Sequence, residues 1–185
     1  FKEIEQPILN NWKGKGYQPQ AYPKAAYAAM VSKLDQYVGE VVKELERLGI
    51  ADHTLIIFTS DNGPHREGGN QPEFFNSSAG FKGIKRSLNE GGIREPMIAY
   101  WPKVIKQGRT SAHIGAFWDF MPTFAALTNQ ALPVPTDGIS ILPTLLAKEN
   151  QQKQHSSLYW EFHEDGGRQA VRLGKWKGIR EQVIK

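Results

Sequence analysis

The chain contains no cysteine among its 185 residues. This absence excludes disulfide bonds and thiolate metal sites within these residues, and it leaves the redox compartment of the protein undecided. Apolar runs are short, and none approaches the length of about 20 residues that a membrane-spanning helix needs. Basic residues do not cluster, and the formal net charge is only +4. This weak basic excess favours an anionic ligand but gives no reason to expect a nucleic-acid partner.

The beginning of the chain also lacks two common features. No signal peptide is recognisable, and the sequence opens at Phe1 without an initiator methionine. We therefore expect an excised part of a longer polypeptide, whose targeting cannot be inferred from these residues. Residues 1–23 have no periodicity and are expected to form a surface loop or a frayed end. The length of 185 residues and a hydrophobic content of 39% still suit a domain with a real core.

The periodicity that follows is typical of an α/β protein. Residues 24–48 carry apolar side chains at spacings of three and four, which predicts one amphipathic helix that packs through its apolar stripe. A short connection leads to an apolar run at 55–58, and a second short apolar run at 96–102 predicts another buried strand. Residues 117–128 predict a further helix, with Asp119 as its N-cap. Helices alternating with short apolar strands are typical of the α/β class.

A polar pair follows the first of these strands. Asp61 and Asn62 come directly after the run 55–58, and Gly63-Pro64 ends regular structure there. A wholly apolar run of this length is typical of a strand buried on both faces of a parallel sheet, whose carboxyl end is where ligands bind. A carboxylate beside an amide carbonyl offers two hard oxygen donors for Ca²⁺ or Mg²⁺. The same residues are also ordinary turn formers, and this simpler interpretation stays open.

A second polar loop begins with Lys85 and continues through Glu90-Gly91-Gly92 to Arg94. The two glycines predict a tight turn that uses positive φ. We expect Arg94 to brace this turn through a bidentate pair with Glu90, while Lys85 points into a pocket. An ammonium group near a hard cation suits a multiply oxygenated anion, because the two charges hold different oxygens. The simpler interpretation of Lys85 is a solvated side chain.

The pattern changes near residue 147. Residues 147–156 are rich in Lys and Gln and form the best linker candidate. Three strands without an intervening helix are then predicted at 158–162, 169–173 and 176–180, with Gly174-Lys175 as a two-residue hairpin turn. We therefore expect a small antiparallel sheet beside the α/β part, with the boundary between residues 147 and 148.

These segments, taken in order, resemble the C-terminal half of an arylsulfatase-type sulfatase of the alkaline-phosphatase-like superfamily. The resemblance covers about residues 22–180 and is carried by the runs HTLIIFTSDNGPH, FKGIKRSLNEGGIREPMIAYWP, FWDFMPTFAAL, TDGISILPTLL, LYWEF and AVRLGKWKGIR. It implies that residues 1–147 are part of a mixed sheet sandwiched by helices. Residues 148–185 would then begin the small C-terminal antiparallel subdomain.

The resemblance also implies roles for particular residues. Asp61 and Asn62 resemble two ligands of the single Ca²⁺ ion in the active site, and Lys85 resembles the lysine that contacts the sulfate group. His65 lies where the family varies and is a possible contact of the sulfate-ester substrate. Three other histidines match no catalytic position: His113, His155 and His163.

Several parts of the family's active site have no counterpart in the sequence. The nucleophile of the family is a formylglycine made from Cys or Ser in a Cys/Ser-x-Pro/Ala-x-Arg run, and no such run occurs here. Because Ca²⁺ takes six to eight oxygens, an isolated Asp-Asn pair is expected to bind it poorly. We therefore expect this chain alone to be inactive and to self-associate through exposed sheet edges. By resemblance, the parent protein is periplasmic or secreted.

Two alternatives remain open at this point. A phosphodiesterase or phosphonate hydrolase of the same superfamily would require a Zn or Mn site rich in Asp and His, which Asn62 disfavours. A non-enzymatic carbohydrate-binding module would stack sugars on four tryptophans, which are more often packing residues. These are Trp101, Trp118, Trp160 and Trp176.

Overall fold

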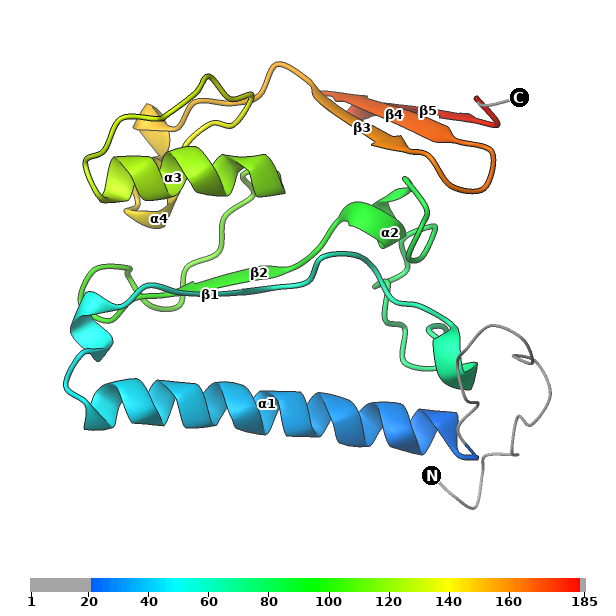
Figure 1. Cartoon of the computed structure of the whole chain (residues 1–185), viewed down its shortest axis with the longest axis horizontal. Helices are drawn as coiled ribbons and strands as arrows, with labels where there is room; N and C mark the ends of the chain where they lie inside the picture. Colours follow the sequence, from blue (N-terminus) through cyan, green and yellow to red (C-terminus); the bar gives the residue numbers. More distant parts are fainter. Residues whose placement is uncertain (1–20, 184–185) are drawn as a thin grey trace.

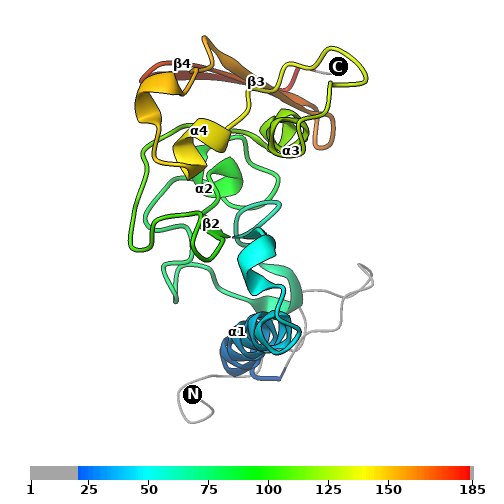
Figure 2. The same cartoon turned by 90° about the vertical axis from the view of Figure 1, so that its left-hand side faces the viewer.

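A computed structural model describes residues 21–183 of the chain. Two perpendicular views show three levels, with helix α1 (Pro23–Arg47) on one side and strands β1 (Ile56–Thr59) and β2 (Met97–Tyr100) in the middle (Figures 1 and 2). The third level contains the helical segment (residues 117–151), which includes α3 (Phe120–Leu127), and the C-terminal sheet (residues 158–181). The loop expected over residues 1–23 lies largely outside the described residues.

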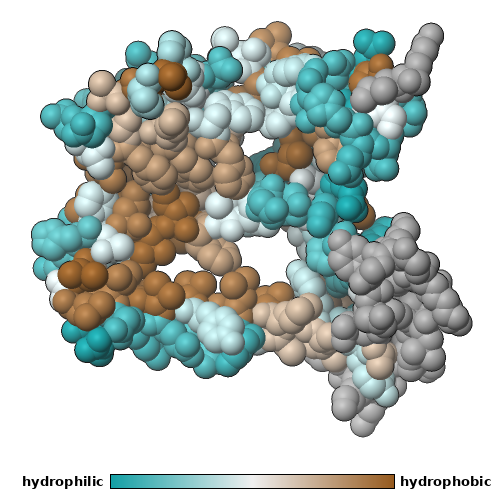
Figure 3. Space-filling view, viewed as in Figure 1, coloured by the Kyte–Doolittle hydropathy of each residue, from teal (hydrophilic) through white to brown (hydrophobic). Residues whose placement is uncertain are grey.

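Helix α1 forms where the apolar periodicity predicts it. Pro23 occupies its first turn, and Gly49 ends the helix with a φ of 69° that suits glycine. Little of the expected packing of its stripe occurs within the described residues, where Met30, Leu34 and Val41 are about half exposed or more. Figure 3 shows hydrophobic side chains gathered on the side of α1 that faces the strands, with polar ones opposite. The stripe is therefore an apolar surface with little cover.

The two central strands pair in a way that corrects the expected parallel sheet. Strands β1 and β2 are antiparallel, with Ile56 opposite Tyr100 and Thr59 opposite Met97. Neither strand is buried on both faces, since Phe58 is exposed and Ile98 is 62% exposed. Short apolar runs do not reveal the relative direction of two strands. A long irregular connection allows the second strand to run antiparallel to the first, whereas a crossover helix would make the two parallel. The polar loops nevertheless leave the same end of this pair.

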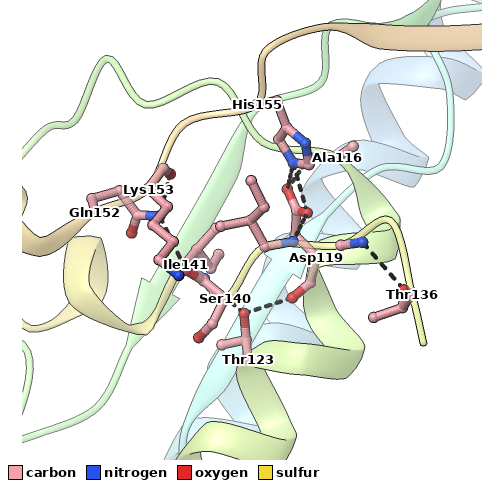
Figure 4. Close-up of polar contacts among 11 residues, drawn as sticks. Ala116, Asp119, Thr123, Thr136, Ser140, Ile141, Gln152, Lys153 and His155 are labelled. Carbon is pink, nitrogen blue, oxygen red and sulfur yellow. Dashed lines mark hydrogen bonds and ion pairs between the residues drawn. The ribbon is translucent and has the colours of Figure 1, made fainter. Parts of the chain in front are cut away.

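The helix predicted at 117–128 consists of a 3₁₀ turn, η3 (Phe117–Asp119), and helix α3 (Phe120–Leu127). Asp119 is 1% exposed and occupies the predicted N-cap position of α3, but its side chain makes no capping hydrogen bond to that helix. Its carboxylate instead accepts hydrogen bonds from the backbone N–H groups of Ala116 and Ile139, and it lies 2.8 Å from Nε2 of His155 (Figure 4). The carboxylate thus joins three segments that are distant in sequence.

Replacing Asp119 by alanine is expected to lower the free energy of unfolding by about 3–5 kcal/mol. The substitution leaves two backbone donors and a largely buried histidine without their acceptor, and such groups are costly when unpaired. Denaturant titration measures the effect, with Asp137→Ala as the matched control because Asp137 is an exposed acid in the same region. Equal midpoints for the two variants would show that this buried carboxylate is not a structural anchor.

The predicted linker is fixed to the helical segment. Gln152 accepts hydrogen bonds from the backbone N–H and the hydroxyl of Thr144. It also donates to the carbonyl of Ser140 (Figure 4). Helix α4 (Leu142–Leu145) and the 3₁₀ turn η4 (Glu149–Gln151) flank these contacts. The domain boundary between residues 147 and 148 stays a prediction. The linker candidate that follows it is hydrogen-bonded to the helical segment through Gln152.

The C-terminal sheet agrees with the expected three strands. It contains β3 (Leu158–Phe162), β4 (Arg168–Leu173) and β5 (Trp176–Glu181), joined as two antiparallel pairs. Gly174 has a φ of 55° in the two-residue turn between β4 and β5, a position where glycine is preferred. One face of the sheet carries Trp160, which lies 6.2 Å from Trp118 of η3 between ring centroids. This contact joins the sheet to the helical segment.

Over residues 21–183, the structure has no helix with the length and apolar content needed to cross a membrane.

Candidate functional site

The two polar loops identified in the sequence lie against each other. The backbone N–H of Gly63 donates to the carbonyl of Gly92 at 3.0 Å, and the backbone N–H of Lys85 donates to the carbonyl of Pro64 at 2.9 Å. The Asp61–Asn62 pair therefore belongs to the same backbone cluster as Lys85. The interpretation of the sequence requires these two loops to be neighbours, and the backbone hydrogen bonds show that they are.

Glycines allow this close approach, but not through positive φ. Gly91 and Gly92 lie in the short helix α2 (Glu90–Ile93) and have ordinary φ, so the predicted left-handed turn is wrong. A Cβ atom on Gly63 would lie 1.9 Å from the carbonyl oxygen of Gly91, and one on Gly91 would lie 2.2 Å from that of Gly83. The glycines are required because three backbone segments pack directly on one another.

Asp61 and Asn62 present oxygen atoms at the end of β1. Asp61 is exposed, and Asn62 uses its amide nitrogen to donate to the carbonyl of Gly63, which leaves its carbonyl oxygen for another partner. Extending the β1–β2 register beyond Thr59 and Met97 places Asp61 opposite Glu95. The Oε1 atom of Glu95 is buried and has no hydrogen-bond partner among residues 21–183. Burial, and then the negative charge of Asp61, raise the pKa of Glu95.

This donor set fits a hard cation. Two carboxylates and an amide oxygen at one strand end create a negative potential that a divalent ion would neutralise, and all the donors are oxygens. The set is incomplete in the described residues, which contain no group of three or more His, Asp or Glu side chains arranged to hold a metal. Further oxygens, from water, substrate or other protein segments, are needed to fill the coordination sphere of Ca²⁺.

Lys85 is paired with a carboxylate that the sequence analysis did not single out. Its Nζ atom lies 3.4 Å from Oε2 of Glu67, and Nδ1 of His65 lies 3.4 Å from the same oxygen. Arg86 lies 3.4 Å from the other carboxylate oxygen of Glu67, Oε1. Burial alone would raise the pKa of Glu67, but the charge of Lys85, aided by His65 and Arg86, lowers it overall. Glu67 therefore stays ionised at neutral pH, and Lys85 retains 29% exposure for a second anionic partner.

A backbone hydrogen bond determines which ring nitrogen of His65 can act as a donor. The backbone N–H of Glu67 donates to Nδ1 of His65 at 3.0 Å, so a neutral ring carries its proton on Nε2. The side chain is 43% exposed. His65 thus offers an N–H donor at Nε2, while its Nδ1 faces Glu67, the carboxylate that Lys85 also contacts.

Glu90 has different partners from those expected. Arg94 approaches it through a single contact of 3.7 Å and stacks on Phe81, so the predicted bidentate pair is wrong. The principal partner of Glu90 is Lys177, whose Nζ lies 2.8 Å from Oε1, and Arg172 lies 3.4 Å from Oε2. Because both partners come from the C-terminal sheet, no local sequence pattern could have identified them.

Comparison with known families identifies the class of protein to which this chain belongs. The family model described as Sulfatase matches residues 5–130, and a second model, N-sulphoglucosamine sulphohydrolase, C-terminal, matches residues 81–185. The chain therefore belongs to the sulfatase family, as its sequence resemblance implies.

Curated relatives include several sulfatases. The chain is 38% identical over 138 residues to mouse (Mus musculus) steryl-sulfatase and 34% identical over 160 residues to human (Homo sapiens) arylsulfatase A. These alignments cover 72% and 83% of this chain but only 22% and 30% of the relatives. The chain thus spans less than a third of the length of these relatives.

Solved structures give the same result for the fold. A structure described as Ps i-CgsB in complex with k-i-k-neocarrahexaose matches with a TM-score of 0.71 and 30% identity, over 92% of this chain and 39% of the other. A protein solved with its substrate D-glucosamine-2-N,6-O-disulfate matches with a TM-score of 0.66 and 28% identity, over 84% and 31%. The predicted alkaline-phosphatase-like fold class is confirmed by these neighbours.

Proposed function

We propose that this chain supplies part of the active site of a sulfuric ester hydrolase. Asp61 and Asn62 act as two ligands of one Ca²⁺ ion, Lys85 contacts the sulfate group, and His65 donates to substrate through Nε2. The observation that carries the proposal is the backbone contact between the two loops, which makes the loop with the oxygen donors a neighbour of the loop with the ammonium group.

The chemistry of a sulfate ester explains why these groups belong together. Calcium, when bound, supplies positive charge that polarises sulfate oxygens. Lys85 holds a different oxygen and stabilises the charge that develops as the ester bond breaks. Glu67 keeps the ammonium group oriented and leaves one side of it accessible. The formylglycine nucleophile of the family comes from another segment, so we expect the 185-residue chain alone to be inactive.

The substrate class that we propose is a sulfated sugar or an aryl sulfate. The names of the relatives support this choice, since one is an arylsulfatase and another structure holds a sulfated glucosamine. We also propose a periplasmic or secreted location, as the resemblance implies.

The alternative functions receive less support. A phosphodiesterase of the same superfamily would need a Zn or Mn site rich in His and Asp, which the amide oxygen of Asn62 beside Asp61 disfavours. A carbohydrate-binding module would need its tryptophans on one surface. Instead, Trp118 packs against Trp160, Trp101 donates to the carbonyl of Asp52, and Trp176 is 71% exposed at the end of the sheet.

An assay of ester specificity tests the function directly. The complete polypeptide that contains this chain, matured to carry the formylglycine, is expected to release sulfate from an aryl sulfate and a sulfated monosaccharide. The matched aryl phosphate diester should be turned over much more slowly, and the 185-residue chain should release nothing. Preferential cleavage of the phosphate diester by the complete protein would favour the phosphodiesterase alternative instead.

The uncovered apolar side chains support the view that this chain acts within a longer polypeptide. We propose that the rest of that polypeptide covers α1 and β2, where Met30 and Ile98 are both 62% exposed. The isolated chain is then expected to self-associate through these surfaces. Light scattering of the isolated chain measures this, and a strictly monomeric species at high concentration would contradict it.

A further inference from the structure

The loop that carries Lys85 is bonded to the C-terminal sheet at both of its ends. At one end, Arg168 of β4 contacts the backbone of Arg86, which directly follows Lys85. At the other end, Lys177 of β5 and Arg172 of β4 contact the side chain of Glu90. Both views show α2 lying between the central strands and this sheet (Figures 1 and 2).

The contact with Arg86 stabilises an unusual backbone conformation. Arg86 has a φ of 73°, in the left-handed region that is unfavourable for a non-glycine residue. Arg168 donates from its guanidinium to the carbonyl oxygen of Arg86 at 2.7 Å. Because this residue is adjacent to Lys85, the conformation held here helps to set the direction in which the Lys85 side chain leaves the backbone.

The contact with Glu90 is a partly buried charge cluster. Lys177 is 13% exposed and Arg172 is 23% exposed, and the two lie opposite each other on the inner face of the sheet. Nζ of Lys177 also lies 5.2 Å from the ring centroid of Trp160. Burial alone would raise the pKa of Glu90, but the hydrogen bond and charge of Lys177 lower it overall, with help from Arg172 and Arg94. Glu90 is therefore charged at neutral pH and bound to the sheet.

We propose that Glu90 and Lys177 form a positioning pair, through which the C-terminal sheet fixes the Lys85 ammonium group relative to the sulfate ester. The proposal rests on the proposed role of Lys85. It assigns the C-terminal sheet a function in sulfate recognition, although the pair itself does not touch substrate. Arg172 supports the same loop through Glu90, and Arg168 supports it through the carbonyl of Arg86.

Sulfate affinity separates a positioning role from a merely structural one. An ion pair that only stabilises the fold would change the amount of active protein and leave the properties of each active molecule intact. A pair that positions Lys85 changes the affinity of each molecule for sulfate. The inhibition constant of inorganic sulfate, measured in the complete and mature enzyme, therefore reports on this pair directly.

In that enzyme, Lys177→Met is expected to raise both the KM for an aryl sulfate and the inhibition constant of sulfate by about 10-fold. This is the lower end of the effect known for groups that orient the ligands of a metal ion, which also act without touching the bound species. Lys177→Arg should restore most of the affinity, because it keeps the charge. Lys175→Met is the matched control, since Lys175 is exposed in the neighbouring hairpin turn. The double variant Glu90→Gln/Lys177→Met should be no worse than the poorer single variant.

Glu90→Asp provides a second test if Lys177→Met does not fold. It keeps the charge but shortens the side chain, so it should weaken sulfate binding while the thermal midpoint changes little. Unchanged sulfate inhibition in folded Lys177→Met or Glu90→Asp would overturn the positioning role. Failure of the wild-type enzyme to release any sulfate is a different result, because it would overturn the proposed function itself.

Discussion

Lys85→Ala is expected to lower kcat/KM for sulfate-ester hydrolysis by about 100- to 1,000-fold in the complete enzyme. Removing one donor that stabilises developing charge has an effect of this size in other enzymes. Because Lys85 is also proposed to bind the ground-state sulfate, the inhibition constant of inorganic sulfate should rise as well. Turnover assays and sulfate inhibition measure both effects on the same preparation.

The control for this variant lies in the same loop. Lys82 is exposed, and Lys82→Ala removes an equal charge three residues away. It should leave kcat/KM within about twofold, as expected for a surface substitution. Lys85→Ala also leaves Glu67 with one cation fewer, so Lys85→Ala/Glu67→Gln is needed to separate lost catalysis from an unpaired carboxylate. Recovery of turnover in that double variant would count against a direct role for Lys85.

Elements with local signals were predicted accurately from the sequence. Helix α1 is predicted at 24–48 and spans Pro23–Arg47. The agreement is close because the signals for a helix, an apolar periodicity with Pro at the start and Gly after the end, all lie within the helix or next to it in the sequence. The three C-terminal strands also match, since a two-residue turn with Gly174 fixes the register of the strands beside it. Local patterns were sufficient in both cases.

Properties that depend on distant residues were not predictable in the same way. The antiparallel direction of β1 and β2 depends on the path of a long irregular connection, which carries no periodicity. Asp119 has an ordinary N-cap position in the sequence, yet its partners include Ile139 and His155, which follow it by 20 and 36 residues. Burial of a polar residue by remote partners leaves no signature in its own neighbourhood.

The candidate site shows the same division. Asp61 and Asn62 follow an apolar strand and were recognisable as a polar pair, and Lys85 was found by its place in a family pattern. Glu67 was missed because an acid in a long glycine-rich loop has no periodicity to mark it. The partners of Glu90 were assigned incorrectly, since the local candidate Arg94 is outcompeted by Lys177, which is 87 residues away.

Asp61→Ala is expected to weaken Ca²⁺ binding by the complete enzyme by about 100-fold or more and to abolish turnover at low calcium. Loss of a supporting group near a metal commonly reduces affinity 10- to 100-fold, and loss of a charged ligand should have at least that effect. Calorimetric titration of the apo-enzyme with Ca²⁺ measures the affinity independently of activity. Because the affinity falls but the rest of the site persists, high calcium should partly restore turnover.

Two further variants decide whether Asp61 acts as a ligand or only as a turn residue. Asp61→Asn keeps one oxygen donor and the shape of the turn but removes the charge, so its calcium affinity should lie between those of wild type and Asp61→Ala. Asp35→Ala removes an exposed acid from α1 and should bind calcium as wild type does. If Asp61→Asn binds calcium as tightly as wild type and Asp61→Ala loses only stability, the pair at the end of β1 is a turn, and the cation site must be sought elsewhere.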